Sequence, residues 1–183
     1  MLKLRIMTAI VLATVFLLGL FFLPWHGFIA FVGLVTLVGA WEWANLAGFT
    51  SMIQRSIYSV LTAVIMFLVA SYTGLLEGVV YIDETRHLLV AASTWWAVAL
   101  LWVQGYPSST VIWSSRWVRA LMGWLVIVPC WLSLSYLHQE HRGSLLILIV
   151  MLTVIAADTG AYFTGKAFGR HKLLANVSPG KSW

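Results

Sequence analysis

Charged residues are scarce in this sequence of 183 residues. They make up 9% of the chain, whereas an ordinary soluble domain is about 25% charged. The chain is also 61% hydrophobic and has a mean hydropathy of +0.92, and a water-soluble fold of this size could not hide so much apolar surface. The composition therefore excludes an ordinary soluble domain and predicts that the protein is folded in a bilayer.

Cysteine is almost absent, and so are the usual signs of separate domains. The single Cys130 cannot form a disulfide within the chain, so no disulfide framework exists. No repeat, low-complexity tract or Pro/Ser-rich linker interrupts the sequence, which favours one compact helical domain with short connections. His138 and His141 approach the spacing of metal ligands, but they have no Cys beside them, and we predict no metal site there.

Long apolar runs dominate what is present. A helix needs roughly 20 apolar residues to cross a bilayer, and six segments meet that requirement. The first follows Lys3 and Arg5 and has no cleavage site after it, so we interpret it as an uncleaved span. The sequence thus predicts an all-α fold, a polytopic transmembrane helix bundle in residues 1–164, followed by a basic loop in residues 165–183. The predicted spans are residues 6–23, 28–46, 57–76, 88–104, 120–137 and 145–164.

The orientation in the membrane follows from the basic residues between the spans, because cytoplasmic loops carry an excess of Lys and Arg. With a cytoplasmic N-terminus, the other side of the membrane would hold Arg86 and Arg142. We therefore expect the N-terminus and the basic C-terminal loop to be cytoplasmic. On that side lie nine basic residues: Lys3, Arg5, Arg55, Arg116, Arg119, Lys166, Arg170, Lys172 and Lys181.

The segment 105–119 between the fourth and fifth spans is too polar to cross the membrane and unusually aromatic for a loop. Trp113 and Trp117 would share one face of a helix, and Arg116 and Arg119 would reach anionic headgroups. An interfacial helix and an irregular loop both remain open.

Two carboxylates fall inside predicted spans, where a charge costs at least ~2.5–3.5 kcal/mol and suggests function. Asp158 lies late in the sixth span within a run of small residues that would let another helix approach closely, so we expect it to face the bundle. Glu42 lies near the inner end of the second span at a similar depth. The alternatives are a structural helix–helix hydrogen bond for Asp158 and a headgroup contact for Glu42.

After the sixth span the composition changes to lysines interleaved with glycines. Lys166, Lys172 and Lys181 either keep this flank cytoplasmic or form a phosphate-binding rim. A P-loop is excluded because Ala175 stands where that motif needs Gly, and the glycines do not fit the dinucleotide-binding pattern.

The last residues of the chain resemble one enzyme family. Their order and spacing are similar to those of the bacterial phosphatidate cytidylyltransferases, and Trp41-Glu42-Trp43 resembles an early span of that family. The matching C-terminal residues are Asp158-Thr159-Gly160-Ala161-Tyr162, Gly165-Lys166, Phe168-Gly169, Lys172-Leu173 and Val177-Ser178-Pro179-Gly180-Lys181-Ser182-Trp183.

The resemblance implies a reaction and its site. It implies that CTP and phosphatidate give CDP-diacylglycerol and pyrophosphate at the inner membrane of a bacterium, with Mg²⁺. Asp158 would be catalytic and a metal ligand, and Glu42 a further metal candidate. Lys166, Lys172, Ser178 and Lys181 would bind substrate.

The resemblance also bears on partners and completeness. The expected partners are CTP, phosphatidate and membrane lipids, with no nucleic acid, and a homodimer is left open. Because the family's signature of a Lys-Asp pair, a His-Gly-Gly run and an Asp-Arg-x-Asp ending is not in the sequence, we interpret the chain as an N-terminal fragment.

Two other functions compete with this interpretation. A transporter subunit would use Asp158 and Glu42 along an ion pathway, but no inverted repeat is evident. A CTP-dependent polyprenol or phytol kinase would transfer the γ-phosphate of CTP instead of its cytidylyl group.

Overall fold

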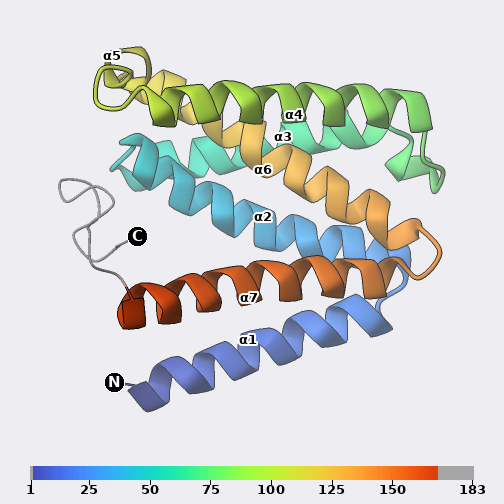
Figure 1. Ribbon diagram of the computed structural model, residues 1–183. Coiled ribbons are helices and arrows are strands. Elements are labelled where there is room, and N and C mark those ends of the chain that lie inside the picture. The colour runs from blue at the N-terminus through green and yellow to red at the C-terminus, as the bar shows by residue number, and fades with distance from the viewer. Residues whose placement is uncertain (1, 169–183) are drawn as a thin grey trace. The chain divides into compact units, whose positions relative to one another are not determined.

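The computed structural model describes residues 2–168, and Figure 1 shows that helices account for nearly all of them. No strand occurs within this range, which confirms the predicted all-α class. Two compact units, residues 1–140 and 141–183, are described separately below. The elements are α1 (Leu2–Phe22), α2 (Trp25–Ala47), α3 (Met52–Tyr72), the short 3₁₀ helix η1 (Leu75–Glu77), α4 (Ile82–Gln104), α5 (Thr110–Trp113), α6 (Arg116–Gln139) and α7 (Gly143–Phe168).

Five of the described helices, α2, α3, α4, α6 and α7, are long and apolar enough to cross a membrane. Their number and composition make this a multi-pass membrane protein. The apolar part of α1, Ile6–Phe22, is shorter than these five. A sixth span through α1 stays a prediction, as do the points where each span meets the membrane surface.

Local signals in the sequence explain where the first helices begin and end. Pro24 separates α1 from α2, because proline has no N–H with which to continue α1. Its backbone is extended, and α2 begins at the next residue. Gly48 ends α2 in the left-handed conformation at φ 101°, and its N–H donates to Asn45. Helix α3 ends at Tyr72, four residues before the predicted end of the third span, and Gly74 then turns the chain at φ 78°.

The aromatic segment between α4 and α6 is mainly a connection. Helix α5 has four residues, and α6 begins at Arg116 with Ser115 as its N-cap, whose hydroxyl accepts from the Trp117 N–H at 3.3 Å. Trp113 belongs to α5 and Trp117 to α6. A single interfacial helix carrying both tryptophans is therefore wrong, because Ser114 and Ser115 separate the two elements.

Within residues 1–140, α2 contacts α6, α3 and α1, while α4 packs against α6. Hydrogen bonds from ring N–H groups to backbone carbonyls join α2 to α6. The indole of Trp25 donates to Ser135 at 2.9 Å, and the indole of Trp43 donates to Arg119 at 2.9 Å. The start of α2 thus contacts the end of α6, and the end of α2 contacts the start of α6, so the two helices are antiparallel. These bonds give each indole N–H a hydrogen-bond partner within the protein.

Helix α3 runs parallel to α6. The Tyr58 hydroxyl donates to the Ala120 carbonyl at 2.8 Å, and the Trp124 indole donates to the Thr62 hydroxyl at 3.0 Å. Both pairs are 62 positions apart in sequence, which requires the two helices to run in the same direction. The rings of Tyr58 and Trp124 also stack, with centroids 5.2 Å apart.

Small residues let the three central helices approach each other closely. Ala40, Ala44 and Ala47 form a buried face of α2 that packs with Tyr58 and Ala120. This packing brings the first turns of α3 and α6 to the same end of the bundle as the last turn of α2.

Candidate functional site

The carboxylate of Asp158 is carried by α7, the one long helix of the second unit within the described residues. Asp158 is exposed in the structure. Around it, the backbone stays helical through a Gly-containing stretch, and the Thr164 hydroxyl donates back to the Gly160 carbonyl at 2.8 Å. A Cβ atom on Gly160 would meet nothing within 4 Å among the described residues. The expectation that Asp158 faces the bundle stays a prediction.

Lys166 lies in the last turn of α7 and is exposed. Asp158, Tyr162 and Lys166 follow each other at intervals of four, which places them along one side of the helix. At 1.5 Å per residue, the Cα atoms of Asp158 and Lys166 are about 12 Å apart along the helix axis. The structure therefore places a carboxylate and an ammonium group on one side of α7. The ammonium group of Lys166 is at the C-terminal end of the helix, where the helix dipole favours a cation.

The other substrate-binding candidates, Lys172, Ser178 and Lys181, lie outside the described residues. Within residues 2–168, no group of three or more His, Cys, Asp or Glu side chains could hold a metal ion. A closed protein cage for a metal is thus absent from this range. One carboxylate such as Asp158 still fits Mg²⁺, because this ion is commonly held by one or two carboxylates together with substrate phosphates.

Glu42 forms an ion pair with a neighbouring arginine. Its Oε1 is 3.1 Å from Nη2 of Arg55, and the Arg55 Nε donates to the Trp41 carbonyl at 3.2 Å. The guanidinium also lies over the Trp41 ring, 4.5 Å from its centroid. Arg55 therefore joins the start of α3 to the end of α2, and Glu42 completes that contact. A metal-binding role for Glu42 stays a prediction.

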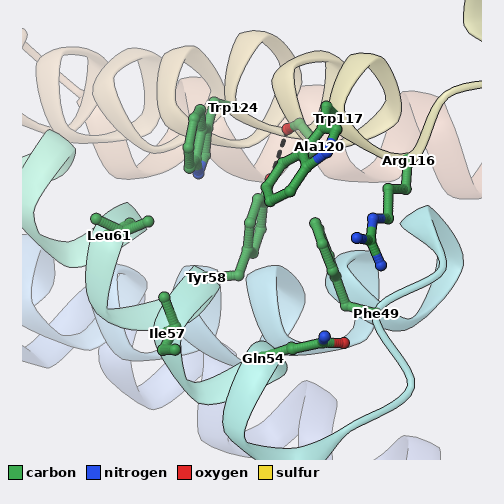
Figure 2. Close-up of a pocket in the computed structure, with 9 residues that line it drawn as sticks. All are labelled: Phe49, Gln54, Ile57, Tyr58, Leu61, Arg116, Trp117, Ala120 and Trp124. Carbon is green, nitrogen blue, oxygen red and sulfur yellow. Dashed lines mark hydrogen bonds between the residues drawn. The ribbon is translucent and has the colours of Figure 1, made fainter.

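A second feature, which we call the α3–α6 groove, is a cavity of about 190 Å³ near the first turns of these helices. Figure 2 shows Tyr58 near its centre, hydrogen-bonded to Ala120. The groove is lined mainly by apolar side chains, and its charged or amide side chains, Arg116 and Gln54, lie near the first turns of the two helices. It is lined by Phe49, Gln54, Ile57, Tyr58, Leu61, Arg116, Trp117, Ala120 and Trp124.

Sequence reasoning singled out Arg116 and Trp117 but missed the partners that α3 places opposite them. Gln54 and Tyr58 are four residues apart on α3 and both line the groove. Two polar side chains on one face at the start of an apolar helix could have indicated in the sequence that this face of α3 lines a site. The position of Phe49, which follows the left-handed Gly48 turn, had no such signal because it depends on how that turn folds.

Two known proteins and one family model resemble nearly all or all of this chain. Residues 3–183 match the cytidylyltransferase family. A phosphatidate cytidylyltransferase of Pseudomonas aeruginosa is 45% identical over 184 residues, covering 100% of this chain and 64% of that protein. The enzyme of that name from Haemophilus influenzae is 37% identical over 193 residues, covering 100% of this chain and 67% of that protein. A phosphatidate cytidylyltransferase of Mycobacterium bovis is 37% identical over 67 residues, 36% of this chain and 22% of that protein.

No solved structure matches the chain. The chain spans about two thirds of the length of the curated relatives it matches from end to end. The match to the family covers Asp158, Lys166 and every other candidate residue. On this evidence, the chain belongs to the cytidylyltransferase family.

Proposed function

We propose that this chain is part of a phosphatidate cytidylyltransferase that makes CDP-diacylglycerol from CTP and phosphatidate. In this reaction a phosphate oxygen of phosphatidate attacks the α-phosphorus of CTP. The bond from that phosphorus to the oxygen bridging the α- and β-phosphates breaks, and pyrophosphate leaves. The observation that carries the proposal is the similarity, over the whole of this chain, to two proteins of that name, at 45% and 37% identity.

The two charged groups of α7 suit this chemistry. The reaction brings two polyanions together, so the main tasks of the site are positioning and neutralising charge. We assign Lys166 to a substrate phosphate, because an ammonium group forms strong charge-assisted hydrogen bonds to phosphate oxygens. We assign Lys172, Ser178 and Lys181 to the same rim from the resemblance.

Asp158 is the described carboxylate that we assign to Mg²⁺. When bound, Mg²⁺ would supply positive charge next to the phosphate oxygens as negative charge builds up on them. Asp158 would itself hold the ion near the end of a membrane helix, within reach of a lipid phosphate at the interface. Glu42 is the weaker choice, because the guanidinium of Arg55 already compensates its charge.

We place the protein in a bacterial inner membrane with its N-terminus and the residues after α7 on the cytoplasmic side. The excess of basic residues on that side supports the orientation. The end of α7 that carries Lys166 would then face the compartment that contains CTP.

Two labelled nucleotides test the reaction in the full-length protein, purified and supplied with phosphatidate and Mg²⁺. CTP labelled at the α-phosphate should transfer its label to lipid, whereas CTP labelled at the γ-phosphate should not. The opposite result, with γ-label in lipid, would identify a kinase and overturn the proposal. A protein that labels no lipid from either nucleotide, although correctly inserted, would also contradict it.

A further inference from the structure

The α3–α6 groove changes from polar to apolar along both helices in the same direction. On α3, Gln54 lies in the first turn, and Leu61 lies seven residues further on, about 10 Å along the axis. On α6, Arg116 is the first residue, and Trp124 follows eight residues later. Because α3 and α6 are parallel, the polar ends coincide. Figure 2 shows Arg116 and Leu61 at opposite sides of the groove.

The walls of the groove combine a buried floor with an exposed apolar rim. Phe49 and Tyr58 are 5% and 3% exposed, whereas Ile57, Leu61 and Trp117 are 54%, 45% and 65% exposed. The rim residues can therefore contact a molecule that lies along the groove. An apolar surface of this kind inside a membrane is suited to a hydrocarbon chain.

The cations at the polar end have no acidic partner in the part of the chain that the structure describes. Its two ion pairs join Arg55 to Glu42 and Arg86 to Asp83, so neither involves Arg116 or Arg119. The Arg116 guanidinium lies 5.2 Å from the centroid of the Trp117 ring and 5.8 Å from that of Phe49. These rings hold the charge at the mouth of the groove and leave its N–H donors available.

A second arginine strengthens the positive charge at this end. Arg119 follows Arg116 by three positions, so the two are neighbours on the helix surface. The Nε of Arg119 is buried and has no hydrogen-bond partner among residues 2–168. The N-terminus of α6 adds its own partial positive charge at the same place.

We propose that the α3–α6 groove is a binding site for one anionic phospholipid of the surrounding membrane. The phosphate of the headgroup binds Arg116, with Gln54 as a further hydrogen-bond donor, and one acyl chain lies over Ile57 and Leu61 toward Trp124. This arrangement matches a lipid in both charge and polarity, because membrane lipids carry their charge at the interface and their chains toward the bilayer centre. The site lies in the first unit and uses neither Asp158 nor Lys166.

The test uses the full-length protein in detergent, with dioleoyl phosphatidylglycerol as the anionic probe and dioleoyl phosphatidylcholine as the zwitterionic one. Native mass spectrometry measures the fraction of each lipid retained. The wild-type protein should prefer the anionic lipid, and Arg116→Gln should weaken its binding about tenfold, the loss expected for one charge-assisted contact. The matched control Arg86→Gln, at the start of α4, should keep the preference.

A second variant tests the apolar half of the groove. Leu61→Trp fills the space for the chain and should reduce the retention of both lipids, while glycerol phosphate, which has no chain, should fail to displace either. An Arg116→Gln protein that keeps the full anionic preference would overturn the proposal. A Leu61→Trp protein that retains lipid normally but changes from dimer to monomer would also overturn it, because the groove would then hold a second copy of the chain. Phosphatidylglycerol is not the proposed substrate, so these results are independent of cytidylyl transfer.

Discussion

The hydroxyl group of Tyr58 occupies the space in which a Cβ atom on Gly123 would lie. The indole of Trp43 crowds the same point from α2. Gly123 is thus the position at which α6 admits side chains from two neighbouring helices at once. Both of these side chains then donate to backbone carbonyls one turn earlier on α6, those of Ala120 and Arg119.

Replacing Gly123 by Ala should destabilise the protein, although alanine favours helix more than glycine does. The added methyl group must displace Trp43 or Tyr58, and overpacking of this kind costs about 1–3 kcal/mol. Thermal unfolding in detergent measures the change. Gly39→Ala on α2 is the matched control, because a Cβ there meets nothing within 4 Å in residues 2–168. Equal stability of the two variants would show that the close approach at Gly123 is unimportant.

Asp158→Asn should lower cytidylyl transfer by the full-length protein about 100-fold or more, because it removes the charge that we assign to holding Mg²⁺ while keeping the shape of the side chain. Membrane insertion and unfolding temperature should stay normal. Asp83→Asn is the control, since Asp83 forms an exposed ion pair with Arg86 at the start of α4. Wild-type rates in correctly inserted Asp158→Asn protein would favour a structural role for this residue.

The pair of Arg55 and Glu42 predicts unequal effects of its two substitutions. Glu42→Gln should change the free energy of unfolding by less than about 1 kcal/mol, since the Glu42 side chain is 66% exposed and exposed ion pairs contribute little. Arg55→Met should cost about 1–3 kcal/mol, because it also removes the bond to the Trp41 carbonyl and the stacking on that ring. Denaturation curves of both variants check the order. A large loss of Mg²⁺-dependent activity in a stable Glu42→Gln protein would instead support its metal-binding role.

Tyr81, at the start of α4, predicts a dependence on alkaline pH. A hydrogen bond to Glu77, together with the negative charge of that carboxylate, raises the pKa of Tyr81 above its ordinary value of 10.0. Since the folded-state pKa is the higher one, the stabilisation is fully present below pH 10.0 and is lost as the pH rises through the folded-state pKa. The ultraviolet difference titration between wild type and Tyr81→Phe reports the ionisation of this phenol. In Glu77→Gln the same titration should move to lower pH, and an unchanged titration would contradict the assignment.

The helical class followed from the sequence because apolar runs of about 20 residues leave few alternatives in a membrane. The helix ends were less predictable, because a helix continues past its apolar part. Helix α4 begins at Ile82, six residues before the predicted span, and its first turn holds Asp83 and Glu84, which suit the positive end of the helix dipole.

The candidate site was predictable in part for a similar reason. A carboxylate within an apolar run is conspicuous in sequence, so Asp158 was identified from the residues themselves. The α3–α6 groove depends on which helices pack side by side and in which direction. The contact between Tyr58 and Ala120 could not be predicted from the sequence of either helix alone. The ion pair of Glu42 was missed because its partner Arg55 lies beyond a turn.

The hydrogen bonds from Trp25, Trp43 and Tyr58 all end on backbone carbonyls, and every amino acid supplies a carbonyl. Positions 119, 120 and 135 on α6 can therefore change residue type without losing their role as acceptors. A saturation library that scores stability should show this asymmetry: the donor positions 25, 43 and 58 tolerate few replacements, whereas the acceptor positions 120 and 135 tolerate most residues that fit the space and keep the helix. Residues at the acceptor positions of α6 can accordingly change during evolution while the register between the helices is preserved.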